Sequence, residues 1–117
     1  MNDDQPSLPI DPALMQRASE LLSEAVMDLA IGPGDVRSRL IVAAGPLRMV
    51  PAEGLPQDLR AEWESIVTDL SSRERTSPYE SEVGHTVSRM KNKTGAKIAE
   101  QIVSLHAKLE ILIGNIN

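Results

Sequence analysis

Four basic side chains lie within nine residues of one another in the last third of the sequence. Arg89, Lys93 and Lys97 are four residues apart, a spacing that stacks them on one face of a helix, and Lys91 lies nearby in the sequence on another face. In a chain of formal net charge −5, this is the one concentrated positive site. Basic side chains clustered in this way can bind the phosphate groups of a nucleic acid or another anion.

Two other interpretations of the basic cluster stay open. The four side chains could simply form a solvated helix face. They could also pair with Glu20, Glu24 and Asp28, which have the same four-residue spacing in an earlier predicted helix. Such pairing, within one chain or across a dimer, would set the orientation of the helices more than their stability.

The two histidines do not form a metal site with the acidic residues around them. His85 and His106 are 21 residues apart on one predicted helix, which separates them by about 30 Å along its axis. Glu82 and His85 have the Glu-x-x-His spacing of di-iron bundles, but a second pair is needed, and Val103 stands three residues before His106. The chain also has no cysteine, and its serines lack the strand-turn-helix context of a nucleophile. We therefore predict no catalytic residue, no metal and no cofactor, and expect a non-enzymatic protein.

The basic residues and both histidines fall on one predicted helix near the end of the chain. Ser77 and Pro78 are a typical start of a helix, and Gly114 with Asn115 a typical end. If unbroken, this helix has about 35 residues and a length of roughly 50 Å. Its apolar or near-apolar side chains recur every three or four residues, at Val83, Val87, Met90, Thr94, Ile98, Ile102, Leu105, Leu109 and Leu112.

Three shorter helices are predicted before it. The first follows an Asp11-Pro12 start and ends at Gly32-Pro33-Gly34. The second begins after Asp35, and Pro46 predicts a kink or a stop near Ala44, with a short turn continuing to about Met49. The third opens at Pro56 and ends near Leu70.

These patterns predict an all-α fold, a small bundle of about four helices with a long C-terminal helix. We predict that residues 1–10 form a flexible tail and that residues 11–117 form a single helical domain. The sequence has no Phe, one Trp and one Tyr, so the core has to be aliphatic.

The long last helix also predicts a contact with another molecule. Three helices of about 14 to 19 residues cannot cover a rod of roughly 50 Å, so part of its apolar face should be left for a partner. We expect a homodimer or partner seam formed by Ile102, Leu105, Leu109, Leu112 and Ile113.

Three functions are compatible with these sequence patterns. The leading prediction is a bacterial-type interaction or regulatory protein that contacts a protein partner, possibly itself, through helix faces, as an adaptor, an inhibitor or an antitoxin- or immunity-like partner. The second is a nucleic-acid-associated regulator that uses Arg89, Lys91, Lys93 and Lys97. The third is a subunit of an enzyme whose site is completed by another chain, near Glu82 and His85. The acidic start and the lack of any apolar run of about 18 residues lead us to expect a cytoplasmic protein without membrane contact.

Overall fold

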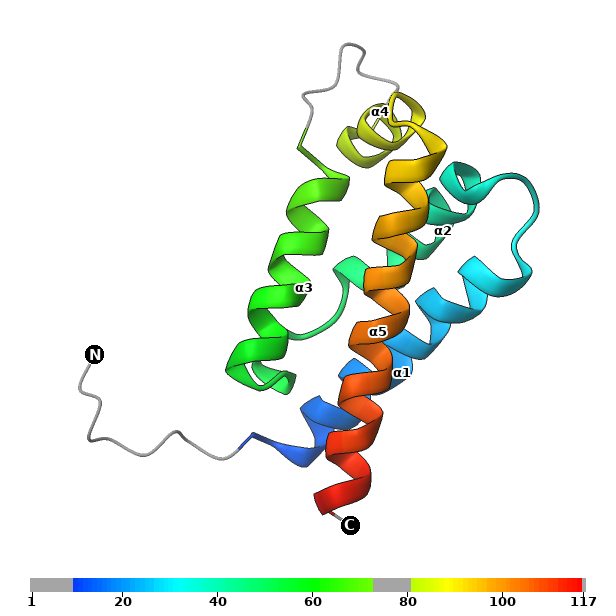
Figure 1. Cartoon of the computed structure of the whole chain (residues 1–117). Coiled ribbons are helices and arrows are strands. Elements are labelled where there is room, and N and C mark those ends of the chain that lie inside the picture. Colours follow the sequence, from blue (N-terminus) through cyan, green and yellow to red (C-terminus); the bar gives the residue numbers. More distant parts are fainter. Residues whose placement is uncertain (1–9, 73–80, 117) are drawn as a thin grey trace.

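The computed structural model describes residues 10–72 and 81–116, and this part of the chain is entirely helical apart from its connections (Figure 1). Its elements, in chain order, are α1 (Pro12–Ile31), α2 (Val36–Arg48), the short 3-10 helix η1 (Ala52–Gly54), α3 (Gln57–Leu70), α4 (Glu82–Ser88) and α5 (Asn92–Ile116). The all-α fold is therefore confirmed, with five α-helices among the described residues instead of the four predicted. The predicted tail lies outside the described residues except for Ile10.

The first two helices begin at aspartates that bind the free backbone N–H groups of the first turn. The Asp11 carboxylate accepts a hydrogen bond from the Ala13 N–H at 2.8 Å, and Asp35 accepts one from the Ser38 N–H at 3.0 Å. Gly34 has a φ of 87° in the turn between the helices, a conformation that favours glycine. α1 and α2 are thus joined as a tight helical hairpin.

The predicted stop of the second helix near Ala44 is wrong, because α2 continues to Arg48. Pro46 lies in the last turn, where it removes a single backbone hydrogen bond and leaves the rest of the helix intact. Gly45 precedes it and has no Cβ to meet the proline ring, which lowers the usual cost of a helical residue before proline.

The predicted long helix is broken at residues 89–91, so the length of roughly 50 Å that an unbroken helix would have does not apply. α4 closes with two i→i−3 hydrogen bonds, from the Arg89 and Met90 N–H groups, and the first bond of α5 runs from the Gly95 N–H to the Lys91 carbonyl. α5 is continuous from Asn92 through Gly95 to Ile116. The predicted start at Ser77 and Pro78 lies outside the described residues.

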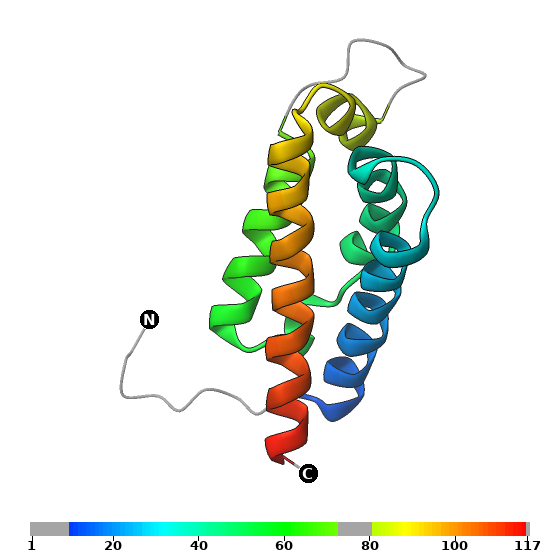
Figure 2. The same cartoon turned by 45° about the vertical axis from the view of Figure 1, so that its right-hand side comes forward.

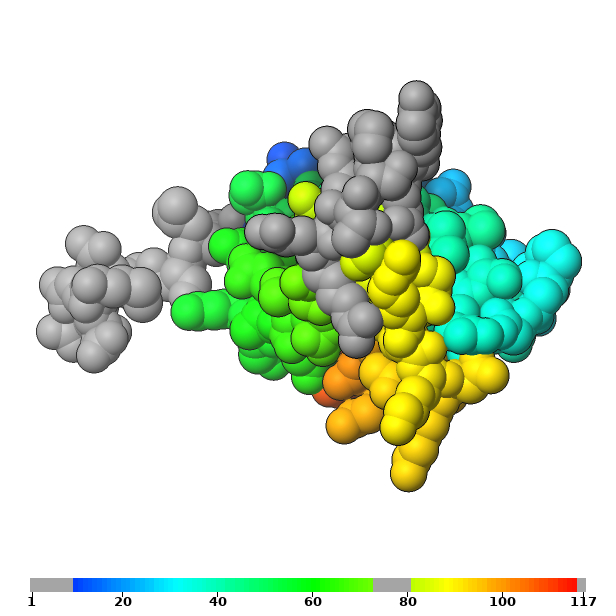
Figure 3. All heavy atoms as spheres, turned by 90° about the horizontal axis from the view of Figure 1, so that it is seen from above, coloured from blue at the N-terminus to red at the C-terminus, as the bar shows by residue number. Residues whose placement is uncertain are grey.

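Burial explains the break. Viewed from above, α4 lies between the end of α3 and the beginning of α2 (Figure 3). This placement buries Val83 and Val87 against the end of the bundle. A straight extension of α5 would carry both valines beyond α1 and α2, where they would face water, so the change of direction is favoured by the hydrophobic effect.

α5 is the central helix of the bundle. Figure 2 shows α3 on one side of it and α1 and α2 side by side on the other. The core between these helices is aliphatic, as expected, and its largest fully buried side chains are Leu22, Leu40, Leu47, Leu55, Leu70, Ile102, Leu105, Leu109 and Val87. Trp63 packs at the edge of this core and donates a hydrogen bond from its indole Nε1–H to the Leu47 carbonyl at 2.8 Å.

Candidate functional site

The helix break divides the predicted basic cluster. Arg89 ends α4, where its guanidinium donates hydrogen bonds to the His85 carbonyl at 3.1 Å and to the Ser88 hydroxyl at 3.0 Å. Lys91 lies in the connection, and only Lys93 and Lys97 share a face of α5. All four side chains are exposed. The segment that carries them forms a projecting corner in the view from above (Figure 3).

The lysines at this corner make no ion pair within the described part of the chain. The acidic face of α1 is not their partner there, since Glu20 contacts Arg17 at 3.5 Å, and Glu24 and Asp28 take part in no ion pair between described residues. Lys91 and Lys93 also stand at the N-terminal end of α5, where the helix dipole disfavours added positive charge. This corner is therefore suited to an anion.

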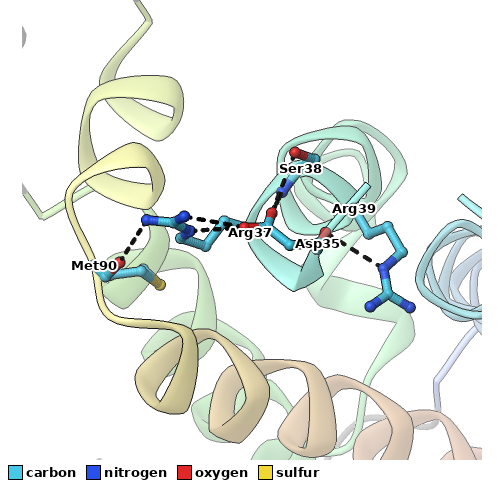
Figure 4. A network of polar contacts seen from close by, with 5 residues as sticks. All are labelled: Asp35, Arg37, Ser38, Arg39 and Met90. Atoms are coloured by element: carbon cyan, nitrogen blue, oxygen red, sulfur yellow. Dashed lines mark hydrogen bonds and ion pairs between the residues drawn. The ribbon is translucent and has the colours of Figure 1, made fainter. Parts of the chain in front are cut away.

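Next to this corner, a network of polar contacts connects the beginning of α2 with the segment between α4 and α5 (Figure 4). The Arg37 guanidinium lies 3.0 Å from an Asp35 carboxylate oxygen and donates a longer hydrogen bond, 3.5 Å, to the Met90 carbonyl. The Ser38 backbone N–H and the Arg37 guanidinium hold the pKa of Asp35 below its usual value of 3.8. Asp35 thus caps α2 and orients Arg37 toward the connection between α4 and α5.

The structure places most of the predicted partner seam inside the molecule. Ile102, Leu105 and Leu109 are fully buried against the other helices of the same chain, and Leu112 and Ile113 are partly buried beside them. The apolar stripe of α5 packs against α1, α2 and α3. The first three residues are therefore not accessible to a partner, which corrects the predicted position of the seam.

The acidic and histidine side chains do not gather into a metal site in the described residues. His85 is buried in α4, whereas Glu82, three residues earlier, is exposed on the first turn. Glu82 and His85, near which an enzyme subunit would have its site, therefore differ in their exposure to solvent.

One constellation that the sequence did not predict joins α1 to α5. The buried Ser19 hydroxyl donates a hydrogen bond to a Glu110 carboxylate oxygen, and His106 Nε2 lies 3.5 Å from the same oxygen. A serine nucleophile requires the histidine between the hydroxyl and the acid. Here the carboxylate stands between the other two groups, so the arrangement ties two helices together and does not have the order of a serine–histidine–acid site.

An open groove of about 620 Å³ runs between α3 and α5. Its lining carries both signs of charge, with Lys97 and Glu100 at one end and a 2.6 Å ion pair between Lys108 and Glu62 at the other. Because opposite charges alternate along it, the groove has no single electrostatic preference for a ligand.

Most of the exposed large apolar side chains of the described residues belong to α1, to α2 and to the residue that follows α2. Five large apolar side chains there are between 42% and 74% exposed: Met27, Ile31, Ile41, Val42 and Met49. In the described part of the chain, only Val103 and Ile111 of α5 are large apolar residues of comparable exposure. Such clustering is characteristic of contact surfaces.

We call this surface the hairpin face and define it by exposed residues at helical spacing. α1 contributes Arg17, which pairs with Glu20 at 3.5 Å, together with Glu20, Glu24, Met27 and Ile31. α2 and its C-cap residue contribute Ser38, Ile41, Val42, Gly45, Arg48 and Met49. A side chain at Gly45 would meet nothing within 4 Å, so the centre of the α2 part is open.

Sequence reasoning did not single out the hairpin face, because its apolar residues lie outside the regular stripes that indicate a core. The exposed Ile41-Val42 pair next to the buried Ala43-Ala44 pair is the signal that was available, since it makes both sides of α2 apolar. No described helix has the length and apolar character that a membrane crossing requires. Comparison of the chain with protein-family models, with curated proteins and with solved structures finds no match in any of the three.

Proposed function

We propose that this protein is a non-enzymatic interaction protein that contacts a protein partner through the hairpin face. The observation that carries the proposal is the concentration of exposed apolar side chains on α1 and α2. Burying such side chains at an interface contributes about 25 cal/mol per Å² of apolar area. Charged residues at the border of the same surface, Glu20, Glu24 and Arg48, are suited to selecting the partner.

Further support comes from the chemistry of the site. The described polar clusters are a structural bridge at Ser19 and Glu110, a helix cap at Asp35 and a groove of mixed charge, and none of them places a histidine between a hydroxyl and an acid. The location that we propose for this activity is the cytoplasm.

The proposal is tested by affinity capture from the native host with two matched variants. The first, Val42→Asp with Met49→Asp, places two charges on the hairpin face. The second, Ser65→Asp with Ser104→Asp, adds the same charge at exposed positions of α3 and α5. A protein recovered by wild type and by the serine variant, but not by the hairpin variant, is the expected result. Equal recovery by both variants would contradict it.

A second candidate function is contact with nucleic acid at the α4–α5 corner. It is favoured by the exposed Lys91, Lys93 and Lys97, which have no acidic partner among the described residues. Three phosphate contacts would give a log–log salt dependence of binding with a slope of about −2 to −3.

Fluorescence anisotropy with a random duplex at low salt tests this second candidate. The three lysines are replaced by alanine, and the control replaces Arg17, Arg48 and Lys108, which are also exposed, so that both variants lose the same charge. Binding that is lost only in the lysine variant supports the corner as the contact. Equal loss in both variants would mean a nonspecific effect of net charge.

A further inference from the structure

Two methionines of the hairpin face are the most exposed sulfur-containing side chains in the described part of the chain. Met27 of α1 is 54% exposed, and Met49, the C-cap residue of α2, is 66% exposed. Met15 is only 9% exposed and belongs to the core, and Met90 is partly buried against the core. Solvent therefore reaches the methionines of the contact surface better than those of the interior.

The chain has no thiol that would compete with these two side chains for an oxidant. An accessible cysteine thiolate is readily oxidised by peroxides, but the sequence contains no cysteine. The methionine thioether is the other sulfur group of proteins that is commonly oxidised. Among the described residues, Met27 and Met49 are thus the side chains at which such a reaction should start.

We infer that Met27 and Met49 form an oxidation site that weakens the partner contact of the hairpin face, an inference that rests on the proposed function. The oxidant is a peroxide, of which hydrogen peroxide is the simplest. A lone pair of the thioether sulfur attacks one peroxide oxygen and forms an S–O bond while the O–O bond breaks. The proton of the transferred oxygen moves to the leaving oxygen, which departs as water. Sulfur is oxidised to the sulfoxide, and the peroxide is reduced.

The product changes the character of the contact surface. The thioether is apolar, whereas the sulfoxide is polar and its oxygen accepts hydrogen bonds. Met27 and Met49 are two of the five large apolar side chains that are exposed on the hairpin face. Burying a sulfoxide oxygen against apolar groups of a partner, without a hydrogen-bond donor, opposes association. We expect binding to weaken at least about tenfold once both residues are oxidised.

The fold should not change, because neither side chain contributes to the core cluster. Oxidation of Met15 would instead place a polar group among buried aliphatic side chains. Methionine sulfoxide reductases return the sulfoxide to the thioether, so the modification is reversible. Oxidation at Met27 and Met49 therefore provides a way to weaken and restore the contact while the chain stays folded.

Treating the full chain with hydrogen peroxide and mapping its peptides by mass spectrometry tests the position of the site. Met27 and Met49 should each gain an oxygen atom at least about tenfold faster than Met15, because Met15 is buried. The midpoint of thermal unfolding should stay within about 3 °C of the untreated chain. Equal rates at the three methionines would overturn the inference.

Replacing methionine by leucine tests the consequence for the contact. Met27→Leu with Met49→Leu keeps apolar side chains of similar volume but removes both sulfurs from the hairpin face. Met15→Leu with Met90→Leu is the matched control, because it removes two sulfurs elsewhere in the chain. Peroxide should shorten the retention of wild type and control on a phenyl matrix, which binds exposed apolar surface, and leave the hairpin variant unchanged.

Affinity capture from the native host then compares the same chains before and after peroxide. Recovery of the partner should fall at least about tenfold for wild type and control. It should return after treatment with a methionine sulfoxide reductase and stay constant for Met27→Leu with Met49→Leu.

The outcomes separate this inference from the proposed function. Unchanged recovery by wild type with both residues oxidised would overturn the oxidation site, and the proposed function would still stand if Val42→Asp with Met49→Asp abolished capture. Equal recovery by the two aspartate variants would contradict the proposed function, whatever peroxide does. Recovery that peroxide reduces only in chains that retain Met27 and Met49 would confirm the inference.

Discussion

Replacing Leu109 by alanine is the most direct test of whether the apolar stripe of α5 belongs to the core or to an intermolecular contact. Leu109 is completely buried, so the change removes three carbon atoms from a packed interior and leaves a cavity. Leucine-to-alanine changes at such positions cost about 2–5 kcal/mol. At about 3–6 °C per kcal/mol for a chain of this size, the midpoint of thermal unfolding should fall by roughly 10–20 °C.

Ile111→Ala is the matched control, because Ile111 lies two residues further along the same helix and is 64% exposed. Its effect on the free energy of unfolding should stay within about 0.5 kcal/mol. Urea unfolding measures both values, and an unchanged dependence of the free energy on urea shows that the unfolded states are comparable.

Protein concentration distinguishes core from intermolecular contact. If Leu109 packs only within its own chain, the difference between variant and wild type is the same at low and high concentration. An intermolecular role would make that difference grow with concentration, because association contributes to stability by mass action. A loss below about 1 kcal/mol, or a loss that depends on concentration, would refute the burial of Leu109 within one chain.

Three further changes test individual contacts. Gly54→Ala would place a Cβ 2.4 Å from the Leu14 carbonyl oxygen, so we expect chemical denaturation to show a loss of about 1–3 kcal/mol. Trp63→Phe removes the 2.8 Å bond to the Leu47 carbonyl, and the same measurement should show a loss of about 1 kcal/mol. The folded pKa of Asp35 lies below its unfolded value of 3.8, so its contribution is complete above pH 3.8 and is lost as the pH falls through the folded value. Thermal melts of Asp35→Asn should therefore depend less on pH below 3.8 than those of wild type.

The starts of α1 and α2 and the end of α1 could be predicted from the sequence because local chemistry fixes them. Asp11 and Asp35 bind N–H groups of their own helices, and the glycines at 32 and 34 end α1, so no distant residue is needed. The break between α4 and α5 could not be predicted. Residues 89–91 contain neither glycine nor proline, and the apolar spacing continues across them, since Val87, Met90 and Ile98 pack on the same core.

The position of the contact surface could not be predicted for a related reason. A regular apolar stripe such as Ile102, Leu105 and Leu109 has the same pattern whether its neighbours come from the same chain or from another. Only the arrangement of the helices shows that this stripe is covered. Conversely, Val42 and Met49 are apolar residues that do not follow a regular helical spacing. Whether they are exposed depends on which side of α2 the other helices contact.

The bridge between Ser19 and Glu110 has a consequence for the synthesis of the protein. The two residues are 91 positions apart, so a ribosome working at about 5–20 residues per second completes the second one roughly 5–20 s after the first. During this interval α1 can pair with α2 but not with α5, and the side of α1 that carries Ser19 is open to any chaperone at the exit tunnel. The hairpin is thus the earliest unit able to form, and the finished bundle has to assemble around it after most of the chain has emerged.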